Sequence, residues 1–146
     1  MRTRTSWEHY FIPIMLIMVS LECILAVFYS SYLIIILGVI GLIFGSFFLL
    51  IRVRGLENSL YPNSRRMIHF SSSLLFLIQS STLFIVWVQI DAYTTAKIAI
   101  PIFIFLSFIC GLSMILKTID PNNSWNLLDP PLNKIDRSFA SKLKRN

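Results

Sequence analysis

The chain has 146 residues, of which 55% are hydrophobic and 14% charged, whereas soluble domains carry roughly 25% charged residues. This apolar excess, with a mean hydropathy of +0.72, excludes an ordinary soluble domain, because a chain of this length has no interior large enough to bury it. The net charge of +6 does not indicate nucleic-acid binding, since the basic residues fall at the ends of apolar runs, where they face lipid head groups.

Four apolar runs each reach the ~20 residues that a helix needs to cross a bilayer. They occupy residues 10–30, 32–51, 67–88 and 98–116. The first run is too long for a signal peptide and has no cleavage site, so we expect it to stay in the mature protein. The sequence therefore predicts an all-α, polytopic membrane protein. Residues 1–116 would form a compact bundle of four transmembrane helices, and residues 117–146 a basic, mostly extended tail.

The polar segment 52–66 joins the second run to the third and carries four arginines against one glutamate. With four spans, this segment lies on the same side as both termini, and that side holds every lysine and arginine except Lys97. Because positively charged loops face the cytoplasm, we expect the N and C termini both to be cytosolic. Arg52, Arg54, Arg65 and Arg66 are the expected docking surface for anionic lipid or a cytosolic partner.

Two polar residues stand out inside the runs. Glu22 and Gln79 each lie twelve residues from the inner end of their run, so about 18 Å deep. We predict that a protonated Glu22 forms a hydrogen-bonded pair with Gln79 and holds the first and third helices together. A proton or substrate relay through Glu22, and a partner subunit that supplies a base or cation to it, are the alternatives.

Small and polar residues in the runs predict helix packing. Gly38, Gly41 and Gly45 lie on one side of the second run, where two helix backbones can approach closely. We expect them to pack an internal neighbour, with homodimerisation as the alternative. The third run is rich in serine, and we interpret these hydroxyls as packing residues and His69 as amphipathic filler at the interface. Cys23 and Cys110 lie inside apolar runs, so neither a disulfide nor a metal site is expected.

The last five residues contain two lysines in the spacing of a sorting signal. Lys142 and Lys144 resemble the K-x-K-x-x dilysine signal that the COPI coat reads on cytosolic tails, and this resemblance implies retrieval from the Golgi to the endoplasmic reticulum. Asn122 lies in the N-x-S pattern of glycosylation sites, and it should stay bare if the tail is cytosolic.

No nucleophile, phosphate-binding or metal motif occurs, so no catalytic residue or cofactor is predicted. We expect a small non-catalytic multi-pass protein of the endoplasmic reticulum, embedded in the lipid bilayer. It would act as an accessory or assembly subunit with other membrane protein subunits, or as a trafficking adaptor. A lipid-handling membrane enzyme or transporter that uses Glu22 is one alternative. A bacterial inner-membrane protein such as a bacteriocin immunity factor is another.

Overall fold

The computed structural model describes residues 8–26, 32–90 and 95–119, and in these ranges it contains helices and no strands. The helices are α1 (Glu8–Leu25), α2 (Leu33–Val53), the short 3-10 helix η2 (Leu56–Ser59), α3 (Pro62–Gln89) and α4 (Ala96–Ile119). The predicted all-α class is therefore confirmed. The tail beyond residue 119 lies outside the described residues.

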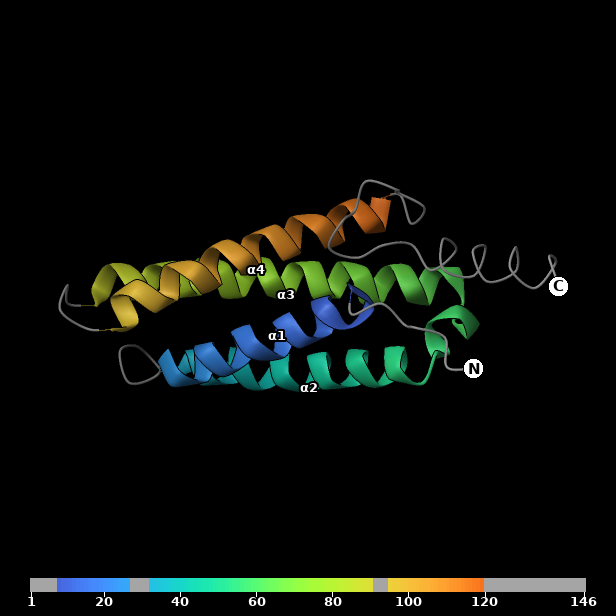
Figure 1. Ribbon diagram of the computed structural model, residues 1–146, viewed down its shortest axis with the longest axis horizontal. Helices are drawn as coiled ribbons and strands as arrows, with labels where there is room; N and C mark the ends of the chain where they lie inside the picture. Colours follow the sequence, from blue (N-terminus) through green and yellow to red (C-terminus); the bar gives the residue numbers. More distant parts are fainter. Residues whose placement is uncertain (1–7, 27–31, 91–94, 120–146) are drawn as a thin grey trace, which may run out of the picture.

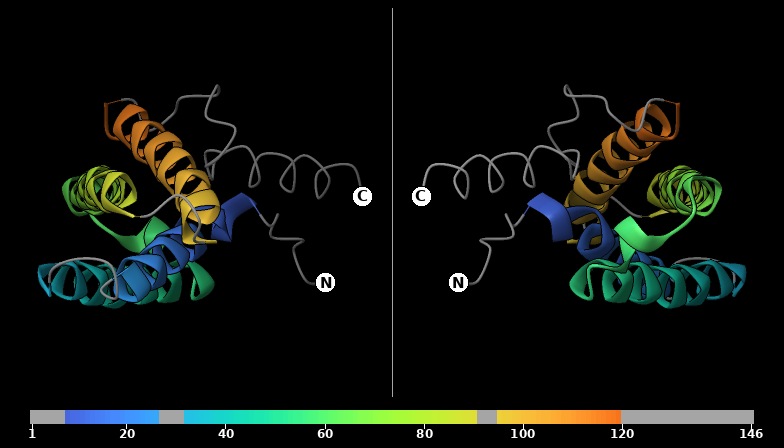
Figure 2. Two further views of the ribbon diagram at one scale, coloured as in Figure 1. Left: turned by 90° about the vertical axis from the view of Figure 1, so that its left-hand side faces the viewer. Right: turned by 90° about the vertical axis from the view of Figure 1, so that its right-hand side faces the viewer.

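The four long helices run antiparallel to their chain neighbours and form two hairpins, α1 with α2 and α3 with α4 (Figure 1). Contacts are much denser within each hairpin than between the hairpins. α4 is inclined to α3 (Figure 2), but hydrogen bonds connect the two helices at several points along their length. η2 connects the hairpins at one end of the bundle, which we call the polar end because Arg52, Glu57 and His69 gather there.

Three of the helices, α2, α3 and α4, are long and apolar enough to cross a membrane, and α1 contributes a shorter apolar stretch, Tyr10–Leu25. The 28 residues of α3 extend about 42 Å, which exceeds the ~30 Å hydrocarbon core of a bilayer. All four helices also expose large hydrophobic side chains. The fold is thus suited to a multi-pass membrane protein in contact with lipid, and the predicted run at 67–88 is extended by a polar first turn.

The connection between the hairpins is defined by local backbone chemistry. Gly55 has φ 66°, and its N–H donates to the carbonyl of Arg52, which ends α2 in the left-handed conformation that glycine favours. Pro62 occupies the first turn of α3, where the missing N–H costs no intrahelical hydrogen bond. The segment 52–66 is therefore partly the end of one helix and the start of the next, with η2 between them.

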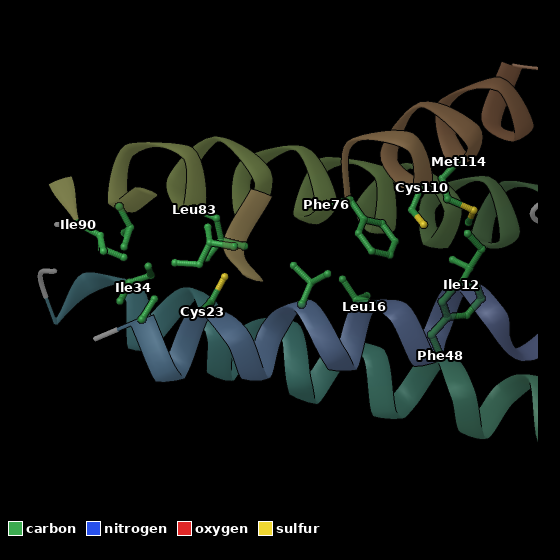
Figure 3. Close-up of a cluster of buried hydrophobic side chains, with 14 residues drawn as sticks. Ile12, Leu16, Cys23, Ile34, Phe48, Phe76, Leu83, Ile90, Cys110 and Met114 are labelled. Atoms are coloured by element: carbon green, nitrogen blue, oxygen red, sulfur yellow. The ribbon is translucent and has the colours of Figure 1, made fainter. Parts of the chain in front are cut away.

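The core is formed by one face of each helix (Figure 3). Ile12, Leu16 and Cys23 of α1 point toward Phe76 and Leu83 of α3, and all five side chains are fully buried. Ile34 and Phe48 from α2, Ile90 just after α3, and Cys110 and Met114 from α4 complete the labelled cluster. The core thus includes side chains from all four long helices.

Candidate functional site

The polar end holds a buried ionic cluster built from three helices. Arg52, in the last turn of α2, donates from Nε to Oε2 of Glu57 in η2 at 3.1 Å and from a second guanidinium nitrogen to Oε1 at 3.4 Å. Nε2 of His69 in α3 lies 3.0 Å from the same Oε1. Glu57 is 4% exposed, Arg52 7% and His69 1%. A charged contact this well buried ties the end of one hairpin to the start of the other.

The electrostatics of the cluster favour an ionised carboxylate. Burial raises the pKa of Glu57, but the hydrogen bond with His69 and the charges of Arg52 and Lys117 lower it more. The net pKa of Glu57 therefore lies well below its usual range. The Arg52 guanidinium also lies over the ring of Phe48, 4.4 Å from the centroid, so one face of the guanidinium makes a cation–π contact with that ring.

This cluster changes the predicted docking surface. Arg52 is buried against Glu57 instead of facing lipid head groups, and Arg65 donates from Nε to the carbonyl of Glu57 at 3.2 Å. Arg65 is half-buried, and Arg54 and Arg66 are exposed. Docking through the exposed arginines stays a prediction.

His69 is not the amphipathic filler that we expected from its position near the interface. That interpretation is wrong, because the ring is enclosed and faces Glu57. Two features of the sequence are compatible with this contact, although neither identifies it. Arg65 and His69 are four residues apart and so share a helix face, and Glu57 is the one acidic residue in the segment that joins the hairpins.

A second polar contact lies in the middle of the bundle. Gln79 of α3 donates from Nε2 to the hydroxyl of Ser20 in α1 at 2.9 Å, and this hydroxyl donates to the carbonyl of Leu16 at 2.6 Å. The predicted pair of Gln79 with Glu22 is replaced by this contact. The reason is the orientation of the two side chains around the axis of α1. Ser20 and Glu22 are two residues apart, which corresponds to about 200° around the helix, so they point in nearly opposite directions. Only one of them can face α3.

The three glycines of α2 lie against α1, where they make the two helices close neighbours. A Cβ at Gly41 would collide with Ser20 Oγ and Gln79 Nε2, and one at Gly38 would lie 2.8 Å from the carbonyl oxygen of Ser20. At Gly45 the nearest atom would be Cγ1 of Ile17 at 3.0 Å. The close approach is therefore an intramolecular one, within the first hairpin.

Serines hold the second hairpin together. Ser73 and Ser80 of α3 donate to the carbonyls of Gly111 and Ile104 in α4, at 3.1 and 3.2 Å. Ser107 of α4 donates in the other direction, to the carbonyl of Phe76 at 2.8 Å. These hydrogen bonds between neighbouring helices fit the interpretation of the third run's serines as packing residues.

The end of the bundle opposite the polar end carries one lysine in the described chain, Lys97. Its ammonium donates to the carbonyls of Trp87 and Ile90, at 2.7 and 3.0 Å, and lies 4.6 Å from the centroid of the Trp87 ring. The indole N–H of Trp87 donates back to the carbonyl of Lys97 at 3.0 Å. Lys97 therefore caps the carbonyl end of α3.

A groove of about 620 Å³ opens between α3 and α4 on their exposed side. Its lining is Ser80, Ser81, Phe84, Ile85, Trp87, Pro101, Ile104, Phe105 and Phe108. Glu22, Gln79 and His69 do not line this groove.

Glu22 lies on α1 with its side chain partly exposed. In the described part of the chain it receives no hydrogen bond or ion pair, whereas Glu57 is held by Arg52 and His69. No group of three histidine, cysteine, aspartate or glutamate side chains in the described ranges is placed to hold a metal ion. Asn122, Lys142 and Lys144 lie outside the described residues.

Comparisons with protein families, with characterised proteins and with solved structures find no match to this chain.

Proposed function

We propose that this protein is a non-catalytic, multi-pass membrane protein that acts as an accessory or assembly subunit of a larger membrane complex. The supporting observation is Glu22. A carboxyl group in an apolar membrane helix is unfavourable unless another group satisfies it, and such residues face a partner or a polar cavity. In the described chain, Arg52, Glu57 and His69 make internal contacts at the polar end, and Lys97 makes them at the opposite end.

The polar contacts of the bundle support a scaffold role rather than a reaction. The carboxylate of Glu57 is engaged by Arg52 and His69, and the amide of Gln79 donates to Ser20. These contacts join α2, η2, α3 and α1 to one another. A bundle with one half-buried acid that no described residue satisfies is suited to docking against another membrane protein.

Extraction in a mild detergent tests this role. The protein should migrate in size-exclusion chromatography with a mass well above that of its 16.9 kDa chain plus detergent, together with a constant set of other membrane proteins. A particle that contains a single chain and no other protein contradicts the proposed role.

We further propose four spans with both termini cytosolic, on the strength of the basic residues at the polar end and in both terminal segments. In sealed microsomes, whose cytosolic face is outward, a membrane-impermeant maleimide should label Asn63→Cys directly. Thr94→Cys should be labelled only after the membrane is permeabilised. The native Cys23 and Cys110 are buried and provide a low background. Labelling of Thr94→Cys in sealed vesicles contradicts this topology.

The proposed location is the endoplasmic reticulum, with cycling through the Golgi and recognition by the COPI coat. It is supported by Lys142 and Lys144 in the sequence. With an N-terminal tag, a chain that carries Lys142→Ser and Lys144→Ser should move to the Golgi or the plasma membrane. An unchanged distribution in microscopy contradicts retrieval.

A second candidate function is lipid handling, and the groove between α3 and α4 is the observation that favours it. Its volume falls in the range of small-molecule sites, and Phe84, Phe105 and Phe108 give it an aromatic wall. In that case the hairpin of α3 and α4, rather than Glu22, would hold the lipid. Transfer of a fluorescent lipid between vesicles should then fall when Ile104→Trp fills the groove and should be unaffected by Glu22→Gln.

A further inference from the structure

A regular seam of residues runs along α1 between its buried side and its exposed side. Phe11, Met15, Met18, Glu22 and Leu25 follow one another at alternating intervals of four and three residues. This is the spacing at which one helix packs along another in a left-handed pair. Met18 is 46% exposed and Leu25 57%, whereas the other three side chains are half-buried, and Phe11 and Met15 also pack against the core. We call these five residues the α1 seam.

The α1 seam lies away from the close contact with α2. Gly38 and Gly45 of α2 lie against Ile24 and Ile17 of α1, and Ile24 is two residues from Glu22. Two residues correspond to about 200° of rotation, so Glu22 points away from α2. The close contact between α1 and α2 therefore does not involve Glu22.

The depth of Glu22 follows from the Gln79–Ser20 contact, which places these two residues at one level. Gln79 lies ten residues, or about 15 Å, before the end of α3, and Glu22 lies about 3 Å further along the same direction. The carboxyl group is therefore about 12 Å short of the end of α3, among apolar side chains rather than in the head-group region.

The chain has no free cation at this depth in its described part. The arginines and Lys117 lie at the polar end, and Lys97 is held by the carbonyls of Trp87 and Ile90. Within the described residues, therefore, no basic side chain supplies a counter-charge to Glu22.

On the basis of the accessory role proposed above, we propose that the α1 seam docks a transmembrane helix of a different protein that carries a basic side chain opposite Glu22. The ion pair would set the register of the two helices, as a single polar seam position does in coiled coils. Met15 and Met18 would adapt to the apolar side chains on either side of the base. A second copy of this chain fits less well, because it would place one carboxyl group against another.

Site-specific photo-crosslinking in native membranes tests this docking on the full-length chain. A diazirine amino acid is introduced at Met18 in the seam and, as a matched control, at Ile43, which is 67% exposed on α2. We expect the probe at Met18 to form an adduct with a transmembrane segment of another protein, mapped by mass spectrometry, with lysine, arginine or histidine within one helical turn of the adduct. The probe at Ile43 should not label this segment.

Substitution of Glu22 tests the charge. Glu22→Leu should reduce the adduct yield about five- to thirty-fold, the effect of a polar contact between membrane helices. Glu22→Lys should abolish the adduct, and replacement of the partner's base by glutamate should restore it. If Glu22→Leu lowers the thermal stability of the purified bundle, Glu22→Gln takes its place, since it keeps the shape of the side chain without the charge.

Four results would overturn the α1 seam as a docking site: adducts with lipid alone, adducts with this same chain, a partner segment without a basic residue, or an adduct yield that Glu22 substitution leaves unchanged. Size-exclusion chromatography of the same extract distinguishes an error in the seam proposal from an error in the proposal of an accessory subunit. If the chain still migrates in a larger complex, only the seam is wrong. If it migrates alone, both proposals are wrong.

Discussion

Alanine at position 41 would place a methyl group where Ser20 and Gln79 meet. A Cβ on Gly41 collides with Ser20 Oγ and Gln79 Nε2 and lies 3.1 Å from Ser20 Cβ. Neither polar atom can withdraw freely, because Ser20 Oγ donates to the carbonyl of Leu16 and Gln79 Nε2 donates to Ser20. The substitution therefore forces α1 and α2 apart or breaks the hydrogen bond between α1 and α3.

The magnitude follows from three contributions to the free energy of unfolding. Overpacking of a filled site costs about 1–3 kcal/mol. Loss of a hydrogen bond between membrane helices adds about 0.6 kcal/mol. Alanine in place of glycine stabilises a helix by about 0.5–1 kcal/mol, which offsets part of these costs. We therefore expect Gly41→Ala to lower the free energy of unfolding by about 1–3 kcal/mol.

The assay is reversible unfolding by sodium dodecyl sulfate in mixed micelles, followed by circular dichroism. Gly45→Ala is the matched control, since its nearest contact is the flexible side chain of Ile17 at 3.0 Å, and we expect a near-neutral effect. In the double variant with Ser20→Ala, the colliding hydroxyl is absent, so the loss should be smaller than the sum of the single losses. The packing explanation is refuted if Gly41→Ala is no more damaging than Gly45→Ala, or if the two losses add.

Three further predictions concern the charged residues. The pKa of Glu57 is lower in the folded protein than its unfolded value of 4.5, so the carboxylate should stabilise the fold fully above pH 4.5 and progressively less below it. Glu57→Gln should therefore make thermal stability less dependent on pH between 6 and 3. Arg52→Met should lower the free energy of unfolding by about 3–5 kcal/mol, because it leaves a buried carboxylate without its guanidinium, whereas exposed Arg54→Met should change it by less than about 0.5 kcal/mol; equal effects would show that both arginines are solvated. Lys97→Met should cost about 1–3 kcal/mol in the same unfolding assay, since the carbonyl of Trp87 loses its charged donor, and an unchanged midpoint would exclude the capping role.

The local features of the fold could be derived from the sequence. The length and apolar content of the runs are sufficient to predict helices, because a backbone in hydrocarbon must satisfy its own hydrogen bonds. The turn between the hairpins could likewise be derived from Gly55 and Pro62, since both residues act on the backbone of their immediate neighbours. The spacing of Gly41 and Gly45 likewise predicted a close helix contact, and the structure places it within the first hairpin.

The partners of the polar side chains were decided by tertiary structure alone. Gln79 was recognised as a buried polar residue, but its partner is Ser20, 59 residues away along the chain, and not Glu22. Depth along a helix follows from counting residues, while the direction of a side chain depends on how the helix is rotated within the bundle. Composition places no limit on that rotation, because every face of these helices is apolar enough to be buried.

The same reason explains the polar end. From the sequence, Arg52 and His69 were indistinguishable from exposed interfacial residues, since both lie where an apolar run meets a polar segment. Docking of the second hairpin on the first encloses them around Glu57 and makes them internal contacts. The sequence by itself predicted which residues lie at the ends of the apolar runs, and the packing of the two hairpins decided which of these are buried and which are exposed.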